Sequence, residues 1–85
     1  MFINKAANGN NNLLGGVISS FRKEMKLSQR MLSDKLQLEG LEIDKNAIQR
    51  IECGKRFITD IEIVYFCKVF NVTPNDLFLS QFRIQ

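Results

Sequence analysis

The chain has 85 residues and a mass of 9.8 kDa, which is enough for one compact domain. It contains no histidine, so His-based acid–base catalysis and a Ser–His–Asp triad are excluded. Its two cysteines are too few for a four-cysteine zinc site or a disulfide framework. The 12 basic and 9 acidic residues give a mildly basic net charge of +3. We therefore expect a protein that is not an enzyme and that uses no cofactor and no metal.

No segment has the basic start and apolar run of a signal peptide, or the roughly 20 apolar residues of a membrane helix. We expect a cytoplasmic protein without membrane contact, in which Cys53 and Cys67 are thiols. Cys67 falls among the apolar residues of a predicted helix, which favours a core position. Cys53 is expected at the surface.

The start of the chain differs in composition from the rest. Residues 4–12 contain five asparagines and show no apolar period, which is typical of a flexible segment. We predict a flexible arm over residues 1–12, a domain over 13–79 and a tail over 80–85. A packed start of the chain is the alternative.

From residue 13 onward, apolar residues recur every three or four positions, which predicts helices and no strands. A second helix is predicted over Gln29–Leu36, with Ser28 as its N-cap, and residues 37–43 form the connector that follows. The first helix, of about ten residues, has an expected apolar side that contains Leu14, Val17, Ile18, Phe21 and Met25.

A third helix is predicted over Lys45–Cys53, with Asp44 as its N-cap and Gly54 as the residue that ends it. At about 100° per residue, the apolar Ala47, Ile48 and Ile51 fall on one side of this helix. The opposite side carries four polar residues and no acid, namely Lys45, Asn46, Gln49 and Arg50.

These four residue types form hydrogen bonds with base edges in the DNA major groove. Arg and Lys donate to guanine O6 and N7, whereas Asn and Gln pair with adenine N6 and N7. A solvated surface with no partner is the alternative, because such polar helix sides are common on ordinary proteins.

The distribution of charge favours the DNA interpretation. Residues 1–35 carry a net +4 and residues 45–56 a net +3, whereas residues 36–44 carry −3 and residues 57–85 carry −1. Positive charge is therefore concentrated around the third helix and the two helices before it, as expected where phosphates are bound. We interpret the acids Glu39, Glu42 and Asp44 as a solvated turn, because their spacing fits no calcium loop.

Several residues together form a specific pattern, which consists of Leu27-Ser28-Gln29, Leu32, Leu36, Ile48 and Ile51-Glu52-x-Gly54-Lys55-Arg56, followed by Thr59, Ile63, Phe66-Cys67, Phe70-Asn71-Val72 and Asp76-Leu77. The chain resembles the phage repressor and Cro-type (Xre-like) helix-turn-helix family over residues 13–79. This resemblance implies an all-α, five-helix, lambda-repressor-like domain with the helix-turn-helix formed by the second and third helices. It further implies a bacterial or phage-derived, nucleoid-associated transcriptional regulator or repressor.

Three departures from the family pattern concern the connector and its surroundings. The segment between Leu36 and Ile48 is about five residues longer than the family's usual turn, in which a glycine takes the place of Gln37; an extended-turn variant of the family has such a connector. Ser33 stands where the family usually has alanine, and Ile58 stands where proline is frequent.

The resemblance implies roles for individual residues. Lys45, Asn46, Gln49 and Arg50 would contact bases in the major groove of double-stranded DNA. Gln29, at the start of the second helix, would contact a phosphate and brace the third helix. Lys55 and Arg56 would contact phosphates, and Arg30 is a further candidate. Contacts to phosphate position such a domain, and contacts to bases specify the sequence that is bound.

A fourth helix is predicted over Asp60–Phe70, with Thr59 as its N-cap, and a fifth starts near Pro74. The fourth helix carries more apolar residues than one buried side requires, and such a surplus usually marks a contact surface. We expect a homodimer, with a further protein partner or domain as the rival occupant. A protein-interaction module of the same fold, such as an antitoxin or a regulatory domain, is the alternative function. The residues of the expected surface are Ile61, Val64, Tyr65, Val69, Phe78 and Phe82.

Overall fold

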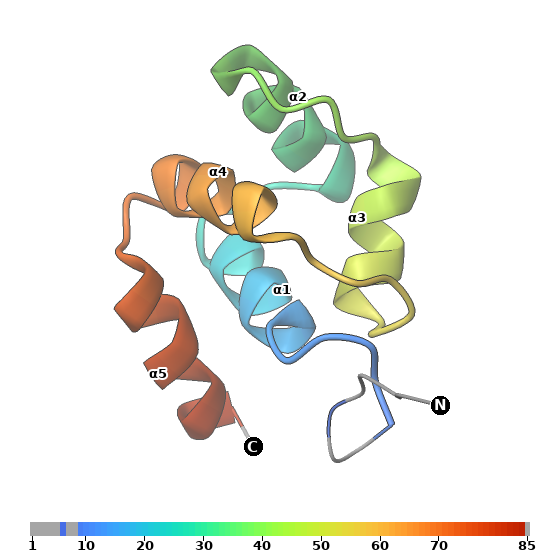
Figure 1. Cartoon of the computed structure of the whole chain (residues 1–85). Helices are drawn as coiled ribbons and strands as arrows, with labels where there is room; N and C mark the ends of the chain where they lie inside the picture. The colour runs from blue at the N-terminus through green and yellow to red at the C-terminus, as the bar shows by residue number, and fades with distance from the viewer. Residues whose placement is uncertain (1–5, 7–8, 85) are drawn as a thin grey trace.

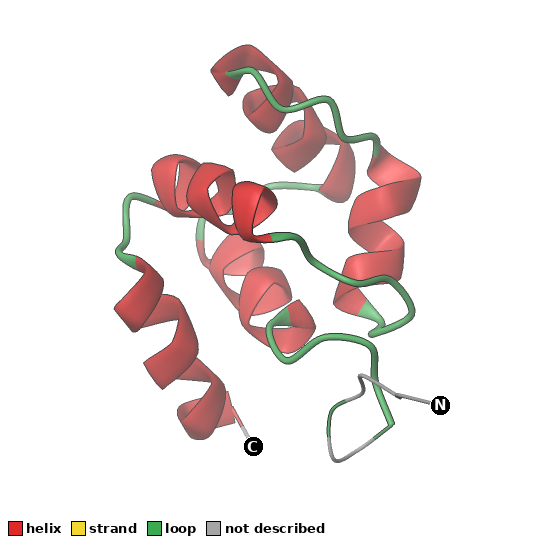
Figure 2. Cartoon of the chain, in the orientation of Figure 1, coloured by secondary structure: helices red, strands yellow, loops and turns green. Residues whose placement is uncertain are grey.

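The protein is described here by a computed structural model, which covers Ala6 and residues 9–84, with side chains up to Phe82 (Figure 1). The described residues form five α-helices and no strand, which confirms the all-α prediction (Figure 2). None of these helices is long and apolar enough to cross a membrane. The helices are α1 (Gly15–Glu24), α2 (Gln29–Glu39), α3 (Lys45–Glu52), α4 (Asp60–Phe70) and α5 (Pro74–Ile84).

The predicted N-caps are confirmed. The Ser28 hydroxyl accepts a hydrogen bond from the amide of Met31, and the Asp44 carboxylate accepts one from the amide of Ala47. These bonds satisfy amides that have no partner inside their own helix, so they determine where α2 and α3 begin. Gly54 follows α3 with a φ of 81°, the left-handed conformation that glycine adopts at low cost.

Two helices are longer than predicted. Residues 37–39 belong to α2, which ends at Gly40 in the left-handed conformation, because nothing before that glycine interrupts the helix. Helix α5 continues to Ile84, so most of the expected tail over residues 80–85 is helical. No glycine or proline follows Pro74 in the sequence, which leaves α5 without a residue that would stop it.

The core lies where α1 meets the other helices. Helix α1 packs against α3, α4 and α5, while α2 packs against α3 and α4 (Figure 1). Phe21 is only half-buried and stacks on Phe70 with ring centroids 5.4 Å apart. Met25 was expected on the apolar side of α1, but it lies just past the end of that helix and is exposed. The buried apolar residues are Leu14, Val17, Ile18, Leu27, Leu32, Leu36, Ile43, Ile48, Ile51, Phe66, Cys67, Phe70 and Leu77.

The long connector between α2 and α3 is held by side chains of α2. The buried Ser33 donates its hydroxyl to the carbonyl oxygen of Ile43 at 2.7 Å. Gln37 Nε2 donates to the same carbonyl at 3.0 Å and to Ser33 Oγ at 3.1 Å. Two of the departures from the family pattern therefore hold the connector in place. Buried Ile43 anchors it on the core immediately before α3 begins.

Replacing both hydrogen-bond donors should destabilise the fold more than replacing one. In Ser33→Ala, Gln37 still satisfies the Ile43 carbonyl, and we expect a loss of about 1 kcal/mol in the free energy of unfolding. In Ser33→Ala with Gln37→Ala, that carbonyl loses both donors, and the loss should reach about 2–3 kcal/mol. Urea unfolding measures both values, with Ser19→Ala on α1 as the control. Equal stability of all three variants would contradict this role for the connector bonds.

Candidate nucleic-acid interface

Helix α3 has one fully buried side. Ile48 and Ile51 have 0% of their surface exposed, and Ala47 is half-buried at the edge of the core. The helix packs against both α1 and α2, so two neighbours hold this side. Burying an aliphatic side chain of this size contributes about 1.5–3 kcal/mol, which makes rotation of the helix about its axis costly.

The opposite side of α3 faces solvent, as the sequence predicts. Lys45, Asn46, Gln49 and Arg50 are all exposed. Among the described residues, their side chains form no hydrogen bond or ion pair, so the polar groups are available to a partner. Only eight residues long, α3 presents all four side chains within about two turns.

A single carboxylate ties α3 to both neighbouring helices. Glu52 accepts hydrogen bonds from Arg22 of α1, at 2.7 Å from Nε and 3.0 Å from the second terminal nitrogen. It also accepts one from Gln29 Nε2 at the start of α2, at 3.1 Å. The hydrogen bond that Arg22 donates to Glu52 raises the pKa of Arg22, which keeps its charge. Gln29 thus braces α3, as the resemblance implies.

The other predicted phosphate-contacting residues lie in two places. Arg30 is exposed in the first turn of α2, beside the start of the helix where Gln29 lies. Lys55 is exposed in the turn after α3, and its amide donates to the Arg50 carbonyl at 2.8 Å. That bond holds the Lys55 backbone to the end of α3. In the sequence, Arg30 precedes and Lys55 follows the exposed side chains of α3.

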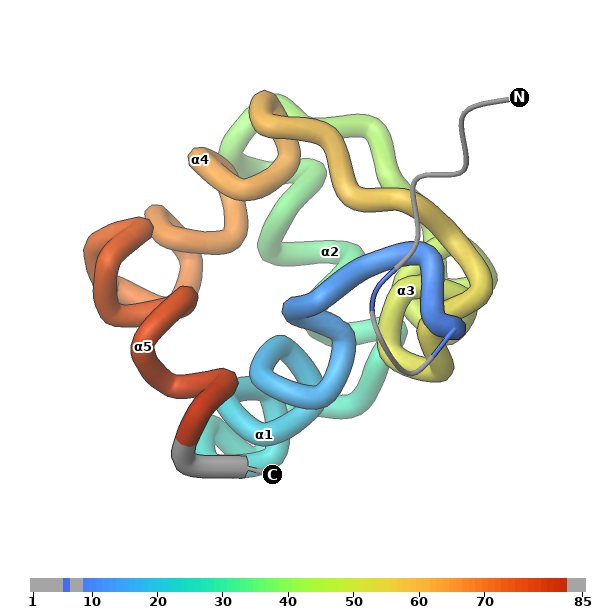
Figure 3. Tube along the Cα trace, turned by 60° about the horizontal axis from the view of Figure 1, so that its bottom comes forward, coloured from blue at the N-terminus to red at the C-terminus, as the bar shows by residue number. Residues whose placement is uncertain are grey.

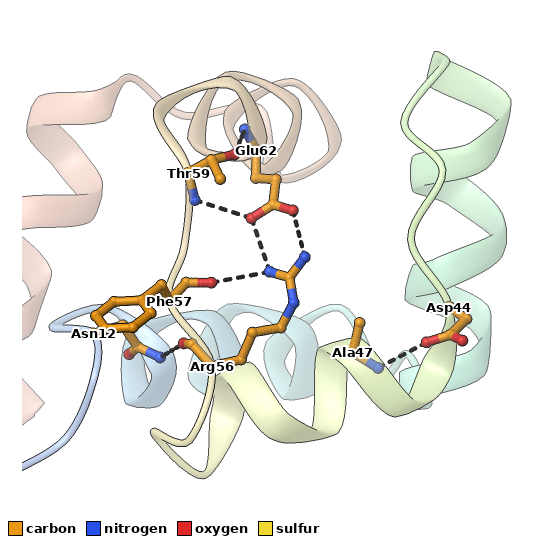
Figure 4. Close-up of polar contacts among 7 residues, drawn as sticks. All are labelled: Asn12, Asp44, Ala47, Arg56, Phe57, Thr59 and Glu62. Carbon is orange, nitrogen blue, oxygen red and sulfur yellow. Dashed lines mark hydrogen bonds and ion pairs between the residues drawn. The ribbon is translucent and has the colours of Figure 1, made fainter.

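Arg56 has an internal partner that the sequence did not predict. Its two terminal nitrogens donate to the carboxylate of Glu62 at 2.9 and 2.8 Å (Figure 4). One of these nitrogens also donates to the Phe57 carbonyl. Glu62 belongs to α4, so the pair ties the turn after α3 to the start of the next helix. The Arg56 guanidinium therefore forms internal bonds that stabilise the fold in this structure.

Glu62 carries out two tasks at the start of α4. Its carboxylate accepts from the Thr59 amide at 3.0 Å, while its own amide donates to the Thr59 hydroxyl at 3.2 Å (Figure 4). Burial opposes ionisation of this carboxyl, but the hydrogen bonds from Arg56 and Thr59 outweigh that effect and lower the pKa of Glu62. The sequence identified Thr59 as a cap but gave no sign that Glu62 is buried.

Only part of the predicted flexible arm over residues 1–12 lies within the described residues, and there Asn11 and Asn12 are packed, as in the alternative of a packed start. Residues 1–5 and 7–8 lie outside the described part of the chain. Asn11 and Asn12, by contrast, form hydrogen bonds with the end of α3 and the turn that follows it. Figure 3 shows this stretch in blue beside α3. The contacts of Asn11 and Asn12 were not predicted, because asparagine composition does not reveal which backbone groups a side-chain amide will meet.

The predicted contact surface on α4 and α5 is only partly exposed. Ile61 and Val64 are exposed on α4, and Phe78 and Phe82 are exposed on α5. Tyr65 and Val69 are half-buried and pack against the edge of the core. The exposed residues also include Leu79, which the sequence did not single out.

The cysteines occupy the expected environments. Cys53 is exposed at the end of α3, and Cys67 is buried. Burial raises the pKa of the Cys67 thiol, which keeps it protonated near neutral pH.

Comparison with known proteins was made by sequence and by structure. No protein-family model matches the chain, and no curated protein matches its sequence. Two crystal structures of the clp gene regulator ClgR from Corynebacterium glutamicum are similar to it, with TM-scores of 0.70 at 16% identity. They cover 81% of this chain, and 68% and 83% of the respective ClgR chains.

The restriction-modification controller protein C.AhdI from Aeromonas hydrophila is also similar, with a TM-score of 0.67 at 22% identity. The match covers 78% of this chain and 91% of the C.AhdI chain. These similarities show that the chain shares the fold of ClgR and C.AhdI, and the described residues form the five-helix, all-α architecture that was predicted.

The lowered pKa of Glu62 makes stability depend on pH. Its ordinary value is 4.5, so the contribution is complete above that pH and is lost as pH falls through the lower value of the folded state. We expect Glu62→Gln to cost about 1 kcal/mol at pH 7, a modest value because Arg56 is partly exposed. The difference from wild type should shrink towards pH 3 in urea unfolding. Asp60→Asn, at an exposed acid in the same turn, is the control; a difference that stays constant with pH would contradict the assignment.

Proposed function

We propose that this protein is a sequence-specific DNA-binding transcriptional regulator that reads the major groove of double-stranded DNA with α3. The observation that carries the proposal is the exposed set of Lys45, Asn46, Gln49 and Arg50 on a helix whose other side is buried. A fold shared with ClgR, a gene regulator, and C.AhdI, a controller protein, supports it.

The chemistry of the exposed side chains suits base recognition. An α-helix fits the major groove, and each base pair presents a distinct pattern of donors and acceptors there. Lys45 and Arg50 offer donors to guanine, while Asn46 and Gln49 each offer both a donor and an acceptor to adenine. No acid lies among the four to repel phosphates, and the acids of the connector precede α3.

Phosphate contacts would come from both flanks of α3. Gln29 and Arg30 lie at the start of α2, where a helix N-terminus favours an anion. Lys55 follows α3 and is exposed. Arg56 is paired with Glu62, so we assign it the role of shaping this turn. Arg30 and Lys55 are the two cations assigned to phosphates in each domain. The logarithm of the binding constant should therefore fall with that of salt concentration with a slope of about −2 per domain, or about −4 for a dimer.

We further propose that the protein acts in the cytoplasm as a homodimer. The exposed apolar residues of α4 and α5 form the proposed dimer surface, of which Ile61 and Phe82 are the most exposed. A symmetric dimer places two recognition helices in successive major grooves about 34–36 Å apart, so the bound site should contain two half-sites at that spacing.

Base and phosphate contacts differ in what their loss does to specificity. A duplex selected from a random pool serves as the target. Arg50→Ala should weaken binding to it by about 1–3 kcal/mol and relax the preference at one base position. Lys55→Ala should weaken binding to all sequences by similar factors and reduce the salt slope by about one. Fluorescence anisotropy with selected and scrambled duplexes measures both effects.

Lys68→Ala on α4 is the matched control, because it removes an exposed positive charge from a helix that the proposal keeps off DNA. It should leave both specificity and affinity nearly unchanged. If Arg50→Ala and Lys55→Ala weakened every sequence alike, the division into base and phosphate contacts would be wrong. If no duplex were selected from the pool, the proposed function itself would fail.

The dimer is tested by analytical ultracentrifugation at micromolar concentrations. Wild type should sediment as a dimer, and Phe82→Asp should shift it towards the monomer, because a charge at this apolar position is costly to bury. Asp60→Asn, at an exposed polar position on α4, should leave the dimer intact. If wild type remained a monomer at high micromolar concentration, the dimer proposal would be wrong. The surface would then be assigned to binding another protein, as in an interaction module.

A further inference from the structure

Three consecutive asparagines, residues 10–12, lie against the end of α3 and the turn that follows it. We call residues 10–12 the asparagine strap. The backbone amide of Asn11 donates to the Gly54 carbonyl at 2.8 Å, and its side chain donates to the Lys55 carbonyl at 2.9 Å. The strap thus joins segments more than forty residues apart in the sequence.

Asn12 makes the most extensive contacts of the strap. Its Nδ2 donates to the carbonyl of Ile51 in α3 at 3.0 Å and to that of Arg56 at 2.8 Å (Figure 4). Its Oδ1 accepts from the amide of Gly15, at the start of α1, at 2.8 Å. One side chain amide therefore connects the beginning of α1, the end of α3 and the turn that follows α3.

Together, the two asparagines satisfy every backbone carbonyl of the turn 54–56. Carbonyls at the end of a helix and in the following turn lack partners within the helix, and they are normally left to water or to a cap. Here the cap comes from a distant segment. The turn in question carries Lys55, whose side chain is exposed.

The packing leaves no room for larger residues. A Cβ atom at Gly15 would collide with the Ile51 carbonyl oxygen, and one at Gly54 would collide with the side chain of Asn10. The strap, α1 and the end of α3 are therefore in direct contact at two glycines. Such close contact restricts where the turn after α3 can lie.

We propose that the asparagine strap is part of the DNA-binding unit, with Asn11 and Asn12 as positioning residues that hold the turn 54–56, and with it Lys55, in place to contact a phosphate. This inference rests on the proposed function. Without the strap, the carbonyls of Gly54, Lys55 and Arg56 would form hydrogen bonds with water instead. Residues 54–56 would then adopt additional conformations. Lys55 would then have to be ordered when DNA binds, at a cost in affinity.

The test uses the chain of 85 residues with Asn12→Ser. The serine hydroxyl still accepts from the Gly15 amide, but it is too short to donate to both distant carbonyls. Asn11→Ala, which removes only the side-chain bond to Lys55, is a second and milder variant. Thr73→Ala is the control, because it removes a hydrogen-bonded cap of similar strength from α5, far from α3 in the chain.

Without DNA, amide hydrogen exchange should be at least tenfold faster at Lys55 and Arg56 in Asn12→Ser than in wild type. The amides of both residues bond to the Arg50 carbonyl and report directly on the turn. Exchange at the core residue Phe66 should be unchanged. Thr73→Ala should leave the turn as in wild type. An unchanged turn in Asn12→Ser would overturn the proposal.

With the selected duplex, Asn12→Ser should raise the dissociation constant about three- to tenfold and make the salt slope shallower by about one. In a Lys55→Ala background, the same substitution should have almost no further effect, because the strap acts through that lysine. If Asn12 only stabilised the fold, Asn12→Ser would weaken DNA binding equally in the wild-type and Lys55→Ala backgrounds, and Thr73→Ala would weaken it as well. Either result would overturn the proposal. A wild type that binds no duplex would refute the proposed function, whereas a wild type that binds as tightly as Asn12→Ser would refute the strap alone.

Discussion

The burial of one side of α3 is the constraint on which the rest of the structure depends. Ile48 and Ile51 are fully buried, and their helix packs against α1 and α2. Glu52, at the end of the same helix, accepts hydrogen bonds from Arg22 and Gln29, so the rotation of α3 about its axis is fixed by packing and by hydrogen bonds. Because polar and apolar residues lie on opposite sides of α3, this constraint alone turns four hydrogen-bonding side chains outward. The proposed recognition of DNA follows from that orientation.

Much of the fold could be predicted because its signals are local. Ser28, Asp44 and Thr59 are side chains that cap the helix directly following them, and each does so in the structure. The alternation of buried and exposed residues on α3 depends only on the helical period. The exposed positions of Lys45, Asn46, Gln49 and Arg50 could therefore be predicted from the sequence.

The parts that escaped prediction depend on contacts between distant segments. Nothing near Glu62 in the sequence indicates that its carboxylate binds Arg56, and an acid in the first turn of a helix is usually explained by the helix dipole alone. Asn12 lies in a segment whose composition favours disorder, yet it binds carbonyls around α3. Ser33 was seen only as a departure from the family pattern. Its bond to Ile43 gives that departure a physical reason, since a longer connector needs an internal donor.

The central claim is that the polar side of α3, with the residues on its flanks, is where DNA binds. The most direct test is an amide NMR titration of the ¹⁵N-labelled chain with a duplex of arbitrary sequence at about 50 mM salt, where phosphate contacts alone support binding. The shifted amides should cluster at residues 29–30 and 45–56. Amides of α3 that stay unchanged while those of α4 and α5 shift, or a spectrum that does not respond at all, would contradict the claim.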